Sequence, residues 1–374
     1  MNTLWDLTGN LLAPRYLRLV FAALVAFFIA ILSIPSIIRT SMQKGLLYAA
    51  NERSSHSGEV PALGGIAIFS AIGISILLLM RIANVQGLQY VMAGIIIVFL
   101  IGIKDDISGL SAWIKLGGQI IACLAVILPG NLFLTSLHGF LTVGDIPPDL
   151  GALLTLFVMI VIINSFNLID GIDGLAGGIG ILAFITYGIW FYLAGHYEIA
   201  IIAAAGIGAL AAFLWFNLYG EQNKIFMGDG GSLVLGFIIA FFTILFNELN
   251  KNPQTNYFVY SAPSVSMGII AVPLYDTLRV FTLRILKGQS PFTPDRSHVH
   301  HILLDIGLSH TRAALVLFLF NLLCVILVFI LSAAGISVIK MIAILLLVCF
   351  AGGETLNQVM LRKKRKNLKH EEVG

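Results

Sequence analysis

Charged residues are scarce in this chain of 374 residues. Asp, Glu, Lys and Arg together make up 11%, whereas apolar residues make up 58%. The low charge excludes an ordinary globular domain, and the high apolar content excludes a disordered chain. With a mean hydropathy of +0.96, the composition is typical of a polytopic membrane protein. The formal net charge of +3 indicates no particular partner, and we expect no nucleic acid to bind.

Cysteines are few, and internal repeats and low-complexity tracts are absent. Cys123, Cys324 and Cys349 each lie inside an apolar run, where a free thiol behaves as a small hydrophobic group. No disulfide framework or cysteine metal site can be built from them. No small-residue cleavage site follows the first apolar stretch, so we expect this stretch to be retained as a span. We predict one membrane domain over residues 1–361 and a basic cytoplasmic tail over residues 362–374.

Long apolar windows make up most of the chain. About eleven of them have the roughly 16 to 23 residues that a helix needs to cross a hydrocarbon core of about 30 Å. The windows are 17–38, 64–80, 88–103, 116–129, 150–166, 178–194, 198–218, 232–247, 266–286, 312–334 and 336–355. We therefore predict an all-α fold, a membrane helix bundle of about 11 transmembrane helices.

The distribution of Lys and Arg predicts the topology. An odd number of spans places the termini on opposite sides, and the basic tail should be cytoplasmic by the positive-inside rule. Most other loop cations then also lie on the cytoplasmic side. The exterior holds Arg15, Arg18, Arg81, Lys251 and Lys340. Arg15 and Arg18 oppose the rule, but the sum over the chain supports this orientation.

Polar residues gather in four clusters beyond apolar windows: residues 104–106, 164–175, 226–232 and 295–301. An Asp at the centre of a membrane helix costs roughly 2.5 to 3.5 kcal/mol, so carboxylates clustered at a membrane edge indicate a functional site. The predicted topology places all four clusters on the cytoplasmic side. We therefore predict one active site in a cytoplasmic-face cleft.

The first cluster has two interpretations. Asp105 and Asp106 could form a solvated turn with Lys104 and Lys115 as exposed neighbours. Alternatively, the two carboxylates face a cleft, where their mutual repulsion raises one pKa and makes that group usable as a base.

The second cluster has polar side chains at intervals of three residues, so they cannot all converge from one intact helix. Gly171 and Gly174 predict that the helix ends or breaks there. Such a break lets Asp170 and Asp173 fold back toward Asn167. The alternative is a helix C-terminal cap with Asp side chains on the surface.

The third and fourth clusters carry groups suited to phosphate. The glycine-rich turn around Asp229 leads into a helix, so its N–H groups can bind phosphate and its carboxylate suits Mg²⁺, although a simple Asp N-cap is an alternative. Arg296, His298, His300 and His301 offer donors for a diphosphate. Zinc is the rival ligand of three histidines, but the hard carboxylates elsewhere favour Mg²⁺.

Taken together, residues 104–106, 164–175, 226–233 and 290–301 resemble the polyprenyl-phosphate N-acetylhexosamine-1-phosphate transferases of glycosyltransferase family 4. The sequence Asp-Arg-Ser-His-Val-His-His at 295–301 is similar to the branch that starts O-antigen, enterobacterial common antigen and teichoic-acid linkage synthesis. The peptidoglycan translocase branch carries three consecutive histidines instead. The resemblance extends over about residues 39–310, with the motifs in the family's order.

The resemblance implies a reaction and its partners. N-acetylhexosamine-1-phosphate, with N-acetylglucosamine-1-phosphate as the favoured group, would pass from a UDP-sugar to undecaprenyl phosphate and release UMP. The cofactor would be Mg²⁺, for which Mn²⁺ can substitute. The enzyme would lie in the bacterial plasma (inner) membrane, in contact with membrane lipid and with its active site facing the cytoplasm. A homodimer is compatible with the sequence.

The resemblance also implies the roles of single residues. Asp229 would be the principal Mg²⁺ ligand, with Asn167 nearby. Asp170 and Asp173 would help to hold the metal or the nucleotide.

Other residues would bind the substrates. Asp105 or Asp106 would bind or deprotonate the lipid phosphate, and a covalent aspartyl intermediate is the alternative mechanism. Asn217 would contact the uridine side of the donor. The groups that hold the donor diphosphate would be Arg296, His298, His300 and His301.

Two other functions fit parts of the pattern. The peptidoglycan translocase reaction uses UDP-N-acetylmuramoyl-pentapeptide, but the form of residues 295–301 disfavours it. A transporter also carries intramembrane charges and helix-interrupting glycines, although its site would lie near the midplane between related repeats. The loop 51–65, with Arg53 and His56, either connects two spans or contributes to substrate binding.

Overall fold

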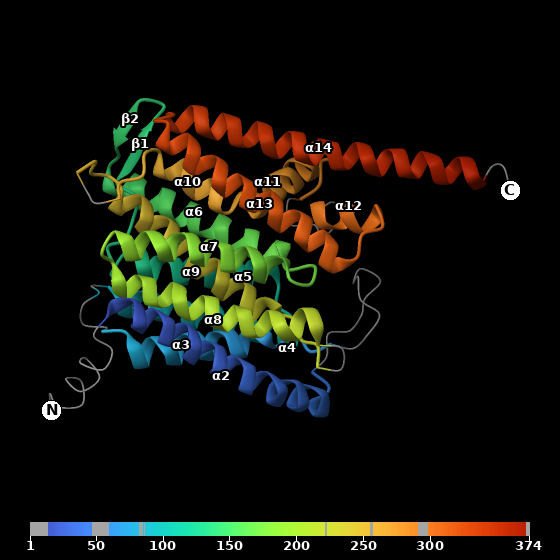
Figure 1. Cartoon of the computed structure of the whole chain (residues 1–374), viewed down its shortest axis with the longest axis horizontal. Helices are drawn as coiled ribbons and strands as arrows, with labels where there is room; N and C mark the ends of the chain where they lie inside the picture. The colour runs from blue at the N-terminus through green and yellow to red at the C-terminus, as the bar shows by residue number, and fades with distance from the viewer. Residues whose placement is uncertain are drawn as a thin grey trace.

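Helices form almost all of the regular structure in the described residues (Figure 1). The computed structural model describes residues 14–46, 60–81, 85, 87–220, 223–254, 257–290 and 298–371, with side chains up to residue 363. The helices are α2 (Arg15–Lys44), α3 (Gly64–Leu79), α4 (Leu88–Ser108), α5 (Ala112–Ile127), α6 (Pro148–Ile169), α7 (Leu175–Leu193), α8 (Tyr197–Tyr219), α9 (Gly228–Leu249), α10 (Ala262–Ile269), α11 (Ala271–Leu286), α12 (Val299–Asp305), α13 (His310–Ala333) and α14 (Val338–Glu371). Each predicted window overlaps one or two of these helices, so the all-α class is confirmed.

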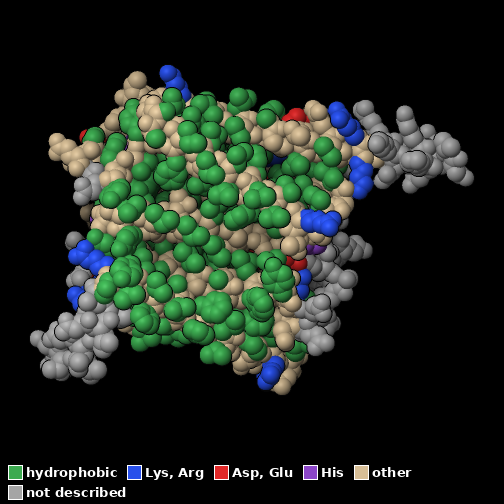
Figure 2. All heavy atoms as spheres, viewed as in Figure 1, with side chains coloured by type: hydrophobic (Ala, Val, Ile, Leu, Met, Phe, Trp, Pro, Cys, Tyr) green, Lys and Arg blue, Asp and Glu red, His purple; other side chains and the backbone are tan. Residues whose placement is uncertain are grey.

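The bundle has the character of a membrane protein. In the described part of the chain, seven helices are long and apolar enough to cross a membrane: α2, α6, α7, α8, α9, α13 and α14. Figure 2 shows apolar side chains across the middle of one face, with Lys and Arg toward its margins. The chain is therefore a multi-pass membrane protein. The count of eleven spans stays a prediction, as does the boundary at residue 361, since α14 continues through it as one helix.

Helix α9 forms the centre of the bundle. In its apolar window 83% of the residues are buried, and α3, α4, α6 and α7 pack against it. Glycines let two neighbours approach its first turn: a Cβ at Gly65 would lie 2.2 Å from the Gly231 nitrogen, and one at Gly102 would lie 2.5 Å from the Asp229 oxygen. Because small residues allow backbones of membrane helices to meet, α3 and α4 directly fix the start of α9.

We expect Gly102→Ala to destabilise the protein by about 1 to 3 kcal/mol, because the added methyl group meets backbone that no side-chain rotation can relieve. Thermal unfolding in detergent measures this as a lower midpoint. The matched control is Gly117→Ala on α5, where an added Cβ has no described atom within 4 Å. Equal midpoints for the two variants would contradict the backbone contact.

The predicted span 266–286 is not one helix but two. The chain breaks at Ile270, where φ is −120° and ψ is 36°. Asn321 of α13 satisfies the interrupted backbone: its Nδ2 donates to the Ile269 oxygen at 2.8 Å, and its Oδ1 accepts from the Val272 nitrogen at 2.9 Å. Broken backbone inside a membrane protein requires such partners, so a buried asparagine on another helix makes this break possible.

A short antiparallel hairpin lies in the connection between α5 and α6. Its strands are β1 (Ser136–Phe140) and β2 (Val143–Asp145), and the register pairs Ser136 with Asp145 and Phe140 with Val143. Just before β1, the Thr135 nitrogen and hydroxyl donate to Glu248, at 2.7 and 2.9 Å. The hairpin is therefore attached to the far end of α9.

Candidate active site

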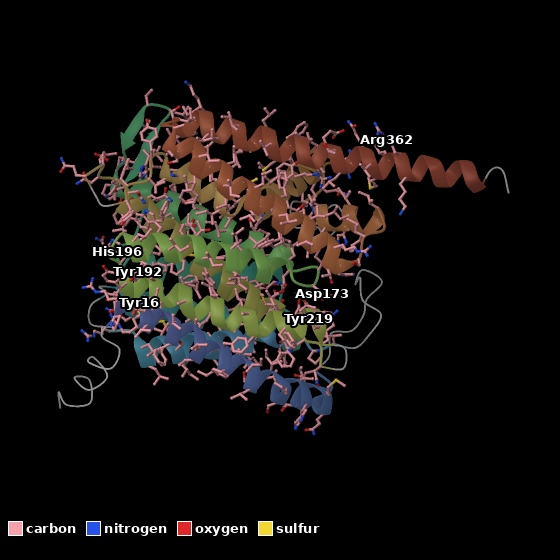
Figure 3. All side chains as sticks on the ribbon, in the orientation of Figure 1. Tyr16, Asp173, Tyr192, His196, Tyr219 and Arg362 are labelled. Atoms are coloured by element: carbon pink, nitrogen blue, oxygen red, sulfur yellow. The ribbon has the colours of Figure 1, made fainter. Side chains whose placement is uncertain are left out.

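The second polar cluster lies at a helix break. Helix α6 ends with Asp170 as its C-cap, and α7 begins after Gly174, which has a φ of +80°. This left-handed conformation favours glycine. Figure 3 shows Asp173 at the opposite end of the bundle from His196. The predicted break is confirmed, and it releases both carboxylates from the helix surface.

The start of α9 is capped by a carboxylate from α4. Asp106 accepts from the Asp229 nitrogen at 2.7 Å through Oδ1 and from the Gly230 nitrogen at 2.9 Å through Oδ2. Gly228 precedes them with a φ of +70°, and a Cβ there would lie 2.7 Å from the Asp106 carboxylate. A carboxylate in this position satisfies free amides and the positive end of the helix dipole. The first and third clusters are therefore in direct contact.

The Asp229 side chain joins three helices. Its Oδ1 accepts from Asn167 Nδ2 of α6 at 2.9 Å, and its Oδ2 accepts from Lys115 Nζ of α5 at 2.8 Å. Lys115 also donates to Asp105 Oδ2 at 3.0 Å. Its side chain is only 24% exposed, so Lys115 is not the solvated neighbour that one interpretation of the first cluster required.

Burial raises the pKa of Asp106 to about 7, with a further contribution from the charge of Asp229. We expected repulsion from Asp105 to cause such a rise, but its contribution is smaller than that of burial. Burial also holds the pKa of Asp170 well above its ordinary value, and the charge of Asp229 adds to this. The two groups lie just beyond the predicted spans. A cation among these carboxylates would be strongly favoured.

Two further residues tie the helix break to the chain ahead of α9. Lys224 Nζ lies 2.7 Å from Asp173 Oδ2. Asn217 is 4% exposed, accepts from the Gly174 nitrogen at 2.7 Å and donates to the Ile225 oxygen at 3.0 Å. The amide of Asn217 therefore positions backbone, and its contact with a uridine stays a prediction.

The described part of the fourth cluster, residues 298–301, begins a short helix. His298 is the N-cap of α12, and His300 and His301 lie in its first turn. A Cβ at Gly171 would lie 2.6 Å from His300 Nε2, so this histidine contacts the turn between α6 and α7. Burial, followed by the charge of His301, lowers the pKa of His300 to about 3. His300 is thus a neutral imidazole beside the second cluster.

A carboxylate outside every motif holds α12 in place. Asp276 of α11 is 2% exposed; its Oδ2 lies 2.7 Å from His298 Nδ1, and its Oδ1 accepts from the Val299 nitrogen at 2.8 Å. The sequence carried one signal for it, a single Asp within the apolar window 266–286. Lys115 and Lys224 had no signal beyond their place in loops.

The groups around Asp229 fit a divalent cation. The Lys115 ammonium lies between the carboxylates of Asp105 and Asp229, so these oxygens are already placed around a positive charge. Among the described side chains, no three His, Cys, Asp or Glu form a group that could hold a metal ion alone. Mg²⁺ is commonly held by one or two carboxylates with water and substrate phosphates, which matches this donor set better than the three-histidine zinc alternative.

The predicted site residues are therefore largely brought together. Asp105, Asp106, Asn167 and Asp229 form one connected set, with Asp170 within electrostatic range. His300 contacts Gly171 in the turn between α6 and α7. Asp276 holds His298 at the start of the same short helix α12. Arg296, Arg53 and His56 lie outside the described residues.

Comparison with known proteins relates the sequence of this chain to glycosyl transferase family 4. A model of glycosyl transferase family 4 matches residues 88–247, the segment that holds the carboxylates and Asn167. A Haemophilus influenzae protein named undecaprenyl-phosphate alpha-N-acetylglucosaminyl 1-phosphate transferase is 34% identical over 75% of this chain and 78% of its own length. Proteins with the same name from Pasteurella multocida and Yersinia pestis are 31% and 28% identical, over 80% and 74% of this chain and 82% and 74% of their own lengths.

Proposed function

The chain belongs to glycosyl transferase family 4, and on this premise we propose that it transfers N-acetylglucosamine-1-phosphate from UDP-N-acetylglucosamine to undecaprenyl phosphate. An oxygen of the lipid phosphate attacks the sugar-linked phosphorus of the donor. The new P–O bond forms as the bond to UMP breaks, so the products are the lipid-linked sugar diphosphate and UMP. The reaction would start a lipid-linked polysaccharide at the cytoplasmic face of the bacterial inner membrane.

The observation that carries this proposal is the convergence of carboxylates from α4, α9 and the α6–α7 turn with a neutral histidine. Asp106 contacts the first amides of α9, and Asn167 and Lys115 hold the two oxygens of Asp229. His300 lies against Gly171. Transfer between two phosphates requires positive charge and hydrogen-bond donors around many negative oxygens, and this end of the bundle offers both.

The residues fall into two groups in this proposal. Asp229, Asn167 and Asp170 would hold Mg²⁺, and Asp173 would help to hold the metal or the nucleotide. When bound, Mg²⁺ would neutralise the phosphate oxygens and stabilise charge on the leaving group. Asp105 or Asp106 would bind or deprotonate the acceptor phosphate.

The histidine helix would form the donor side of the site. His298, His300 and His301 project from the start of α12, close enough together for one diphosphate: the ring centroids of His298 and His300 are 5.5 Å apart, and those of His300 and His301 are 4.3 Å apart. Arg296 would add a cation. Asn217 would support this side by fixing the turn at Gly174.

A direct assay of UMP release tests the proposal. The purified full chain in detergent receives undecaprenyl phosphate, Mg²⁺ and one of three donors: UDP-N-acetylglucosamine, UDP-N-acetylgalactosamine or UDP-N-acetylmuramoyl-pentapeptide. We expect UDP-N-acetylglucosamine to be the donor that releases UMP, and we expect this release to require the lipid. A chelator should stop the release of UMP.

Other outcomes would select the alternatives. Preference for the pentapeptide donor would assign the peptidoglycan translocase reaction. If folded, lipid-supplied protein released no UMP from any donor while vesicles containing it accumulated a solute, the chain would be a transporter.

A further inference from the structure

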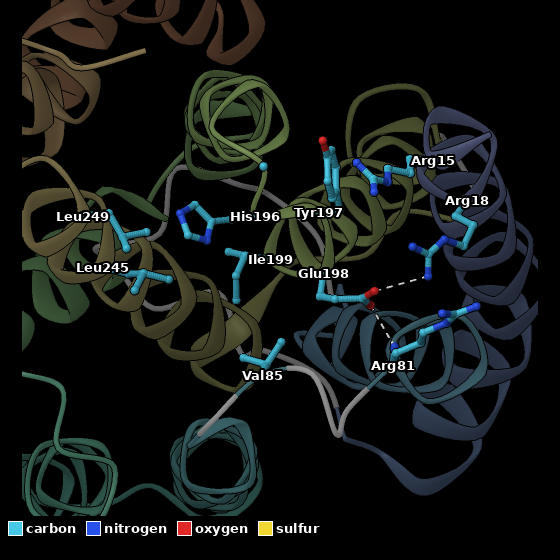
Figure 4. A pocket seen from close by; sticks show the side chains of 11 residues that line it. Arg15, Arg18, Arg81, Val85, His196, Tyr197, Glu198, Ile199, Leu245 and Leu249 are labelled. Atoms are coloured by element: carbon cyan, nitrogen blue, oxygen red, sulfur yellow. Dashed lines mark hydrogen bonds and ion pairs between the residues drawn. The ribbon is translucent and has the colours of Figure 1, made fainter. Parts of the chain in front are cut away.

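A hollow of about 460 Å³ opens at the end of the bundle away from the candidate active site. It lies among the start of α2, the end of α3, the start of α8 and the last turns of α9 (Figure 4). His196, which lines it, lies at the opposite end of the molecule from Asp173 in Figure 3. The hollow is therefore separate from the groups assigned to phosphate transfer.

Positive charge dominates one side of this pocket. The side chains of Arg15, Arg18 and Arg81 gather there around Glu198 (Figure 4). Glu198 binds the Arg18 guanidinium at 3.2 Å through Oε1 and the backbone nitrogen of Arg81 at 2.8 Å through Oε2. Three arginines thus line the pocket beside one lining carboxylate, which forms its side-chain ion pair with Arg18. This leaves an excess of positive charge among the described lining residues.

Tyrosine side chains hold the Arg15 guanidinium in place and indicate the level of the membrane at which the pocket lies. The Arg15 guanidinium lies 4.1 Å from the centroid of the Tyr197 ring, a cation–π contact that holds it at the rim. Tyr192 packs against Tyr197 with centroids 5.4 Å apart, and Tyr16 nearby is 57% exposed. Figure 3 shows Tyr16 and Tyr192 at this end. Because Tyr is enriched at the level of lipid headgroups, the arginines lie where a headgroup phosphate would lie.

The other side of the pocket is apolar. Ile199 of α8 and Leu245 and Leu249 of α9 line it, so the hollow passes from guanidinium groups to hydrocarbon over a short distance. Arg pairs with phosphate through a planar fork of donors, and the apolar wall suits the adjoining glycerol and acyl chains. A free anion would leave that wall without a partner.

We propose that this pocket binds the phosphate headgroup of an anionic glycerophospholipid in the leaflet opposite the active site. The proposal accounts for Arg15 and Arg18, which lie ahead of the first predicted span and oppose the positive-inside rule that the sum over the chain supports. These cations bind lipid rather than set the orientation. The bound lipid would hold the ends of α2, α3, α8 and α9 together.

The test uses full-length protein in detergent and measures lipid binding by native mass spectrometry, with thermal unfolding as a second readout. The probe is phosphatidylglycerol, and the variant is Arg15→Gln combined with Arg81→Gln, which leaves the Arg18–Glu198 pair intact. We expect about thirtyfold weaker binding, which corresponds to about 1 kcal/mol for each arginine, and loss of the lipid-induced rise in unfolding midpoint. Lys340→Gln, an exposed cation at the start of α14 outside the pocket, should bind like the original chain.

Further ligands separate the possible sources of phosphate. Phosphatidylcholine should bind weakly and equally to all variants. Equal binding of phosphatidylglycerol to the double variant, competition by inorganic phosphate at similar concentration, or tighter arginine-dependent binding of undecaprenyl phosphate would each overturn the assignment. If the double variant does not fold, Arg81→Gln alone gives the same comparison with about fivefold weaker binding expected. UMP release is measured separately, so failure of one proposal leaves the other intact.

Discussion

Replacing Asp229 by Asn should reduce lipid-dependent UMP release on the order of a thousandfold, the several kcal/mol that a catalytic divalent cation contributes. The substitution keeps an oxygen that can accept from Asn167, which lies 2.9 Å away. It removes the negative charge that faces Lys115 and would face the metal. The measurement is UMP release from UDP-N-acetylglucosamine at saturating lipid, over a range of Mg²⁺ concentrations.

A control variant distinguishes the effect of removing the Asp229 charge from a general loss of folded protein. Asp149→Asn lies in the first turn of α6, at its end away from the carboxylates, and the residue is exposed; this variant should retain full turnover. Both variants should elute as folded protein in size-exclusion chromatography. If the Asp229→Asn protein turned over within about threefold of the original chain at all Mg²⁺ concentrations, Asp229 would have no part in the proposed metal site.

Replacing Asp276 by Asn should lower kcat/KM for the UDP-sugar by on the order of a hundredfold. The amide oxygen can still accept from the Val299 nitrogen, so the start of α12 keeps its anchor. The amide nitrogen cannot accept a hydrogen bond from His298 Nδ1, which lies 2.7 Å from the carboxylate oxygen that the amide replaces. The imidazole must then reverse its tautomer, and it loses the adjacent negative charge that orients it.

Asp276 would act through His298, so the assay includes a readout that a purely structural role leaves unchanged. The pH profile of kcat/KM should shift in Asp276→Asn, while the thermal midpoint changes less than in Asp276→Ala, which also loses the bond to Val299. Asp305→Asn, an exposed position at the end of α12, should match the original chain in both. An unshifted profile with near-normal turnover would show that the pairing has no part in donor binding.

Apolar windows and glycine positions predicted the helices of this protein well, because length, hydrophobicity and left-handed turns are local properties of a sequence. Gly171 and Gly174 indicated the break between α6 and α7, and the structure has it there. The break at Ile270 was missed because its partner, Asn321, comes from α13, a helix distant in the sequence. Pro273 was a local signal, since it has no N–H to donate to the Ile269 oxygen four residues earlier, but the length of the apolar window favoured a single span.

In the candidate site, too, local motifs predicted some residues, whereas the roles of others depend on the packing of distant helices. Motifs indicated Asp106 and Asp229 as parts of one face, and the structure joins them by a hydrogen bond of 2.7 Å. The contribution of Lys115 could not be predicted, because a lysine in a loop is usually solvated and only the packing of α5 against α4 places it between two carboxylates. The role of Asp276 could not be predicted either, since a single Asp in an apolar window does not indicate which residue it contacts.

The position of Lys115 also bears on how the protein is made. During membrane insertion, uncompensated carboxylates would have to be protonated or remain in water until a metal ion arrived. An ammonium at 3.0 Å from Asp105 and 2.8 Å from Asp229 neutralises part of that charge from within the chain. Assembly of the helix bundle therefore does not require a bound metal or nucleotide. Under the proposed function, a divalent cation would be needed for catalysis rather than for assembly.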